Sequence, residues 1–258
     1  MCHAHLEEEA PILARYEFAR RRVGVTVAYY DWWVQRMLRE VPEHHEGPLV
    51  ELMCGGAEVC RRLPRRFPAA FALDLNVVSV ERAAQSLREA GDLRAHFVGG
   101  TAARVPLPDA CTDVVVIQGA LHHARPQLQQ ILNEVHRILK PQGVFVGSEP
   151  ANDHWLTRSI RHWQYRHSEM QGRDPDEDGF SEDELAALLR RSGLQLDRYR
   201  QFGFIGYPLL ANTDMVPFFA GPRWAWLYNP LMAVDRFLEH VPVLRRMAWA
   251  SLFRAFKG

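Results

Sequence analysis

The chain has 258 residues, of which 47% are hydrophobic and 24% charged, so we expect a globular protein with a substantial core. Basic and acidic residues balance at 31 each, and a net charge of zero argues against a nucleic-acid partner. The four cysteines are scattered, no apolar run is long enough to span a bilayer, and no signal peptide is recognisable. We therefore expect reduced thiols and a cytoplasmic location.

Short apolar runs alternate with helical stretches along most of the chain. A first helix is predicted over 11–40, where apolar side chains recur at near-helical spacing. Strands are predicted, in chain order, at 49–53, 69–75, 95–98, 112–118, 143–148 and 194–202. Helices are predicted between them at 57–63, 80–89, 128–139 and 151–172, and after Ser181, which begins a capping box with Glu184. The segment 248–257 fits a strand or a helix equally well.

This alternation predicts βαβ crossovers and therefore an α/β fold. We expect a Rossmann-like, seven-stranded, mostly parallel sheet with helices on both faces. An N-terminal helical cap should occupy residues 1–48 and the cofactor-binding core residues 49–202. Residues 203–258 should form an aromatic-rich lid and a closing strand of the same domain.

The strongest local signal is the segment VELMCGGAEV, where the first predicted strand ends. A glycine-bearing turn between a strand and a helix lets a ligand approach the backbone and the helix N-terminus. Glu51 can accept a hydrogen bond from a cationic amine. Asp74 ends the second predicted strand, about the spacing at which an acid reaches a ribose. A plain tight turn is the alternative, and the missing GxGxxG argues against a nicotinamide site.

The segment GGTAARVPLPDACTDVVVIQGALHHARPQLQQILNEVHRILKPQGVFVGSEP resembles the small-molecule class I methyltransferases. That family shows a GDA-like turn, an LPF.D.sFD strand, a histidine pair, an E..RvLKPGG helix end and a strand ending in EP. The later FSEDELAALLRRSGL resembles its F(S/T).eEL..ll..aGf segment. These motifs occur in the family's order over about residues 49–196.

The resemblance implies an S-adenosylmethionine-dependent methyltransferase that releases S-adenosylhomocysteine. Glu51 and Gly55 would then hold the amino-acid end of the cofactor, Asp74 the ribose, and the Thr101–Ala102 turn would lie beside the adenine. The full implied cofactor set is Glu51, Met53, Gly55, Asp74, Leu75, Thr101, Ala102 and Gln118.

The cofactor loop departs from the family pattern of three alternating glycines. Met53 and Ala57 occupy the first and third glycine places, and Thr101 replaces the usual acid. A side chain at Met53 would crowd the turn unless its backbone stays at negative φ. These changes keep open an enzyme of the same fold with non-methylating chemistry, such as a cyclase, pericyclase or decarboxylase. They also keep open a non-catalytic binding protein.

Methyl transfer mainly requires alignment of the nucleophile with the methyl group, so a general base is optional. His122 and His123, which follow the fourth predicted strand, are the candidate bases, and a structural role for either is the alternative. Glu149 is a candidate for positioning the substrate, as is His154. We expect no metal, because the terminal MCHAH has no matching ligand cluster.

Aromatic side chains gather in two segments outside the common core. Tyr29, Tyr30, Trp32 and Trp33 lie in the first, and the second contains Phe204, Tyr207, Phe218, Phe219, Trp224, Trp226, Tyr228 and Phe237. We expect a lid over a small, hydrophobic or aromatic acceptor, although such residues are commonly core. The cluster Arg245, Arg246, Arg254 and Lys257 with Trp249, Phe253 and Phe256 suggests membrane-surface contact as a further alternative.

Overall fold

A seven-stranded sheet forms the centre of the computed structural model, which describes residues 24–43, 47–167, 178–211 and 222–258. The strands are β1 (Leu49–Leu52), β2 (Ala70–Asp74), β3 (Ala95–Gly99), β4 (Thr112–Gln118), β5 (Leu139–Pro150), β6 (Leu194–Phe202) and β7 (Ala250–Lys257). Their order is β3-β2-β1-β4-β5-β7-β6, and β7 alone runs antiparallel to the other six strands. The predicted Rossmann-like α/β fold is confirmed.

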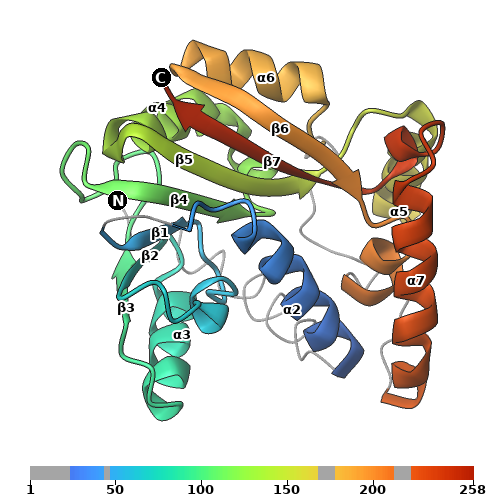
Figure 1. Ribbon diagram of the computed structural model, residues 1–258, viewed down its shortest axis with the longest axis horizontal. Coiled ribbons are helices and arrows are strands. Elements are labelled where there is room, and N and C mark those ends of the chain that lie inside the picture. The colour runs from blue at the N-terminus through green and yellow to red at the C-terminus, as the bar shows by residue number, and fades with distance from the viewer. Residues whose placement is uncertain (1–23, 44–46, 168–177, 212–221) are drawn as a thin grey trace.

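Helices cover both faces of the sheet (Figure 1). The helices are α2 (Gly24–Leu38), α3 (Val77–Glu89), α4 (Leu128–Ile138), α5 (Trp155–His167), α6 (Glu182–Arg191) and α7 (Tyr228–Glu239). Shorter helical turns are η1 (Cys60–Arg62), η2 (Leu121–Gln127), η3 (Tyr207–Ala211), η5 (Pro222–Leu227) and η6 (Arg245–Met247). None of the helices in these described ranges is long and apolar enough to cross a membrane.

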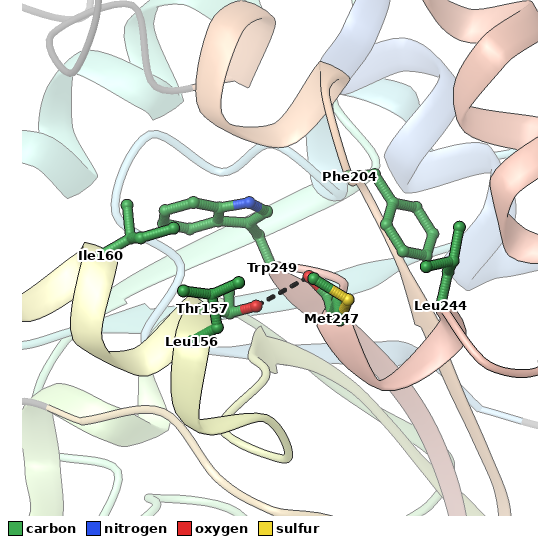
Figure 2. Close-up of a pocket in the computed structure, with 7 residues that line it drawn as sticks. All are labelled: Leu156, Thr157, Ile160, Phe204, Leu244, Met247 and Trp249. Atoms are coloured by element: carbon green, nitrogen blue, oxygen red, sulfur yellow. Dashed lines mark hydrogen bonds between the residues drawn. The ribbon is translucent and has the colours of Figure 1, made fainter.

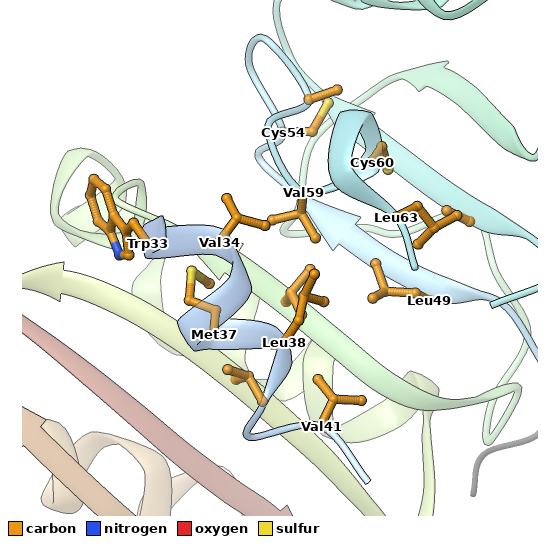
Figure 3. Packing of buried hydrophobic residues seen from close by; sticks show 14 of the residues in the cluster. Trp33, Val34, Met37, Leu38, Val41, Leu49, Cys54, Val59, Cys60 and Leu63 are labelled. Carbon is orange, nitrogen blue, oxygen red and sulfur yellow. The ribbon is translucent and has the colours of Figure 1, made fainter. Parts of the chain in front are cut away.

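Two apolar layers hold the helices to the sheet. Buried side chains of α2 and α3 pack on one face, where Figure 3 shows Val34 and Leu38 of α2 beside Val59 and Leu49. Side chains of α4 and α6 pack on the other face. In α4 the buried positions are Leu128, Ile131, Leu132, Val135 and Ile138, a helical spacing that places them all on one side.

Several element boundaries differ from prediction, and the differences have local causes. β5 begins at Leu139 rather than 143, because Leu139 already pairs with Thr112 of β4. A register shift follows, with Gln142 at a φ of 63°, and regular pairing with β4 resumes at Val144. The ambiguous C-terminal segment is the strand β7. Ser181 caps α6 as predicted, with its hydroxyl accepting from the Glu184 amide at 3.3 Å. The remainder of the predicted first helix (11–23) and of the predicted 151–172 helix (168–172) falls outside the described residues.

One contact holds the segment after β6 together, and a second fastens it to α2. The buried carboxylate of Asp235 in α7 accepts hydrogen bonds from the amides of Ile205 and Gly206, at 2.7 and 3.0 Å. Arg36 of α2 forms a two-point ion pair with Glu239 of α7, with both N–O distances at 2.8 Å. The segment is thereby held beyond the carboxyl end of β6, next to α2.

Candidate cofactor and acceptor site

The loop after β1 adopts a glycine-like backbone at residues that are not glycine. Met53 and Ala57 have φ values of 54° and 55°, and Gly55 between them has 47°. Met53 thus takes the positive φ at which its side chain crowds the turn. The loop is fixed by hydrogen bonds from the Cys54 amide to the Leu73 carbonyl at 3.0 Å and from the Ala57 amide to the Cys54 carbonyl at 2.6 Å. Left-handed backbone costs an L-residue about 1–2 kcal/mol, so this loop stores strain.

Glu51 lies beneath this loop and is almost fully buried. Its carboxylate accepts the amides of Val59 at 3.2 Å and Cys60 at 2.8 Å, which anchors the segment that follows the loop. Burial raises the pKa of Glu51 to about 7, and the hydrogen bonds from Cys60 and Val59 oppose that rise. A cation brought close to this carboxylate would favour its ionised form.

Asp74 ends β2 and reaches across to the loop. One carboxylate oxygen accepts the Gly55 amide at 2.7 Å and the other accepts the Asn76 amide at 2.8 Å. The spacing between loop and acid, noted in the sequence, thus reflects a direct contact between them. Each oxygen retains a second lone pair, so hydroxyl donors can still approach it.

Features at the ends of β2 and β4 indicate space for a ligand. Within the described part of the chain, the buried Gln118 Nε2 atom has no hydrogen-bond partner, which is costly unless a ligand or water supplies one. Gly119 follows with a φ of 60°, and a Cβ placed there would meet nothing within 4 Å. Leu75, directly after Asp74, is 67% exposed, although it is a large apolar side chain.

The Thr101–Ala102 turn follows β3 at the same edge of the sheet. Its threonine hydroxyl accepts the Ala103 amide at 3.2 Å, and Ala102 is buried. Because β1 to β4 are parallel, this turn, Asp74, the 53–57 loop and Gln118 all lie at the carboxyl edge of the sheet. Ligands of open α/β sheets bind at this edge.

Glu149 at the end of β5 organises the histidine turn η2. Its buried carboxylate accepts the amides of Ala120 and Leu121 through one oxygen, at 3.0 and 2.9 Å. The other oxygen lies 2.7 Å from Nδ1 of His122 and also accepts the His122 amide at 3.3 Å. Both oxygens of Glu149 thus contact protein groups, and its predicted role in positioning the substrate stays a prediction.

The two other candidate histidines differ from His122 in their surroundings. His123 is exposed, and its ring centroid lies 3.9 Å from that of His122. His154 accepts the Leu156 amide through Nδ1 at 3.2 Å, so it caps the start of α5. Of the three, His122 combines burial with a carboxylate partner.

An apolar pocket of about 240 Å³ lies at the same edge of the sheet, beyond β5, β6 and β7. It is lined by Leu156, Thr157, Ile160, Phe204, Leu244, Met247 and Trp249. Figure 2 shows the Trp249 ring beside Ile160, with Phe204 and Leu244 on the other side. The Thr157 hydroxyl donates to the Met247 carbonyl at 2.9 Å, so this polar group is already paired.

The aromatic segments divide between core, pocket and surface. Trp33 is core and donates from Nε1 to Ser148 at 2.8 Å, whereas Phe204 and Trp249 line the pocket. Trp226 and Phe237 are mostly exposed, and Phe218 and Phe219 lie outside the described residues. The sequence analysis missed Leu156 and Ile160 as pocket residues. Their four-residue spacing places them on one face of α5, and this was the signal that could have identified them.

A family model described as "Methyltransferase domain" matches residues 50–147, which confirms the resemblance seen in the sequence. The rice (Oryza sativa subsp. japonica) 24-methylenesterol C-methyltransferase 2 is 32% identical over 129 residues, 49% of this chain and 33% of that protein. The UbiE ubiquinone/menaquinone biosynthesis C-methyltransferase of Rubrivivax gelatinosus is 24% identical over 75% of this chain and 80% of its own length. The chain spans less than half of the length of the first curated relatives, 44% and 33%.

Solved structures share the fold at low sequence identity. The [4+2]-cyclase SpnF superposes with a TM-score of 0.60 and 17% identity, over 88% of this chain and 80% of the cyclase. One fold therefore accommodates proteins named for different reactions, so the fold alone does not specify the reaction.

Proposed function

We propose that this chain, whose residues 50–147 belong to the methyltransferase domain family, transfers a methyl group from S-adenosylmethionine to a small apolar acceptor. The observation that carries the proposal is the buried Gln118 Nε2 atom, which has no hydrogen-bond partner within the described residues and lies at the same carboxyl edge of the sheet as the 53–57 loop and Asp74. A ligand at this edge would supply the missing hydrogen bond.

The residues present fit the cofactor. Asp74 would receive the ribose hydroxyls on the remaining lone pairs of its carboxylate. Leu75 would cover one face of the adenine, and the Thr101–Ala102 turn would lie along its edge. Glu51 would act mainly through its charge, because its oxygens already hold the Val59 and Cys60 amides.

S-adenosylmethionine supplies an electrophilic methyl carbon: the acceptor atom forms a bond to it, and the pair of the broken carbon–sulfur bond passes to sulfur. The protein must hold the acceptor in line and keep water out. An acceptor hydroxyl or amine must also lose a proton in the process.

His122 is the residue best placed to take that proton. The Glu149 carboxylate accepts hydrogen bonds from three backbone amides. We infer that it also accepts the hydrogen bond that joins it to the His122 ring. The 2.7 Å contact then places the ring proton on Nδ1, which makes Nε2 the basic nitrogen. Glu149 would thus act as a positioning residue.

The pocket bounded by Ile160, Phe204 and Trp249 supports an acceptor with an apolar part. Its lining offers apolar surface and the one hydroxyl of Thr157, which is already bonded. The names of two relatives, which refer to a sterol and to quinone biosynthesis, agree with such an acceptor.

The test is formation of S-adenosylhomocysteine with phenols and quinols that carry aliphatic chains of increasing length. We expect KM to fall as the chain lengthens, and Ile160→Trp, which fills the pocket, to raise KM about tenfold without changing cofactor affinity. Leu93→Trp, at an exposed residue on the opposite edge of the sheet, is the matched control. No product with any acceptor, despite bound cofactor, would refute methyl transfer.

The resemblance to SpnF supports one alternative, a methyltransferase-fold enzyme with non-methylating chemistry. It predicts conversion of an acceptor without formation of S-adenosylhomocysteine. The same assay therefore separates the two reactions.

A further inference from the structure

The rim of the apolar pocket projects from the carboxyl edge of the sheet. Three segments meet at this rim: the start of α5, the turn after β6 and the segment before β7. They contribute Leu156, Phe204 and Leu244, respectively, to the lining of the pocket. Figure 1 shows α5 and α7 together beyond this end of β6. We define the pocket rim as Trp155, Ile160, Val243, Arg245 and Arg246, each of which lines the pocket or adjoins a residue that does.

Large apolar side chains of the rim face solvent. Val243 is 85% exposed, Trp155 is 71% exposed, and Ile160 is 39% exposed while it also lines the pocket. Val243 adjoins Leu244, so an exposed tip and a pocket wall come from the same short turn. Exposed apolar groups at the mouth of an apolar pocket mark a site of contact with another apolar phase or molecule.

The rim also carries positive charge that is not neutralised locally. Arg245 and Arg246 are exposed, and neither has an ion pair with a carboxylate of the described residues. Two acidic groups of the neighbouring elements are already paired, Glu239 with Arg36 and Asp178 with Arg158. Two adjacent guanidinium groups beside an apolar tip are complementary to an anionic surface with an apolar interior.

We propose that the pocket rim docks on the surface of an anionic lipid bilayer. Trp155 and Val243 enter the interfacial region, and Arg245 and Arg246 contact lipid phosphates. The remaining members of the C-terminal cluster do not take part, because Arg254 pairs with Asp197 and Lys257 donates to the Leu139 carbonyl. Docking in this orientation turns the mouth of the pocket toward the bilayer.

The test is co-sedimentation of the full chain with vesicles of phosphatidylcholine alone or mixed with phosphatidylglycerol. We expect binding to the mixed vesicles at low ionic strength and weaker binding in high salt. Arg245→Gln with Arg246→Gln should weaken binding roughly tenfold or more, since each arginine contributes about 1 kcal/mol at an anionic surface. Val243→Ser should weaken it further.

Matched controls lie on the opposite edge of the sheet. Arg190→Gln with Arg191→Gln removes another adjacent arginine pair, and Leu93→Ser removes another exposed apolar side chain. Both should bind vesicles as the unmodified protein does. Absence of the unmodified protein from the pellet, equal binding to neutral vesicles, or equal losses in the controls would overturn the proposal. The assay involves no methyl transfer, so its outcome is separate from that of the proposed activity.

Discussion

At the scale of single residues, acidic side chains at the strand ends bind backbone amides. Glu51 and Glu149 are buried, and each holds amides of a segment that follows a neighbouring turn. Asp74 does the same for Gly55. These carboxylates fix the loops on which cofactor and acceptor would lie, and the arrangement has a measurable dependence on pH.

The ionisation of Glu51 should make the protein less stable as pH rises. Its pKa is about 7 in the folded chain, because of burial, against an ordinary value of 4.5. Between these values the folded state holds more protons than the unfolded state, so the free energy of unfolding falls as pH increases. In Glu51→Gln this contribution is absent. Urea unfolding at pH 5 and pH 7.5 should show a smaller pH dependence for the variant; equal dependences would contradict the burial of an ionisable group there.

The sequence located these residues better than it identified their contacts. Asp74 was found from its spacing to the glycine turn, and Glu51 from its place late in a strand. Their partners are backbone amides of the Gly55 turn, Val59 and Cys60, and backbone amides carry no residue-specific signal. For Glu149 the same limit applies: the sequence pointed to a role in positioning the substrate, and the backbone amides that it binds could not be read from the sequence.

At the scale of elements, the 53–57 loop is strained by its own sequence. Ala57 is buried and has a φ of 55°, where glycine carries no steric penalty. Ala57→Gly should therefore cost little or even stabilise the protein, because relief of strain offsets the lost methyl group. Ala83→Gly in α3, also at a buried alanine, has no strain to relieve and should cost about 1 kcal/mol or more.

Thermal or urea unfolding of the two variants measures the difference directly. We expect Ala57→Gly to be the more stable by at least about 1 kcal/mol. If the two substitutions are equally destabilising, the left-handed backbone at Ala57 is wrong.

Strongly patterned elements were predicted best. β4 matches its predicted range, because a run of β-branched residues is typical of a strand buried on both faces. β7 could not be distinguished from a helix, since a strand between β5 and β6 is covered on both sides and loses the alternation of apolar and polar residues. The early start of β5 depends on pairing with β4 across a register shift, a contact between distant segments.

At the scale of the whole molecule, the carboxyl edge of the sheet collects every feature that we connect with function. The 53–57 loop, Asp74, Gln118 and the His122 turn lie over the β2-β1-β4 half, and the apolar pocket lies over the β5-β7-β6 half. The Arg36–Glu239 pair joins helix α2 to α7 of the segment after β6. Cofactor and acceptor would therefore bind at the same edge of the sheet, over its two different halves.

The most direct test is calorimetric titration of the purified chain with S-adenosylmethionine and with S-adenosylhomocysteine. We expect one site with micromolar affinity for both, weakened in Leu75→Ser and unchanged in Leu93→Ser, a matched substitution of another exposed leucine. Absence of binding of either compound to the folded protein would contradict the proposed cofactor site, and with it the proposed methyl transfer.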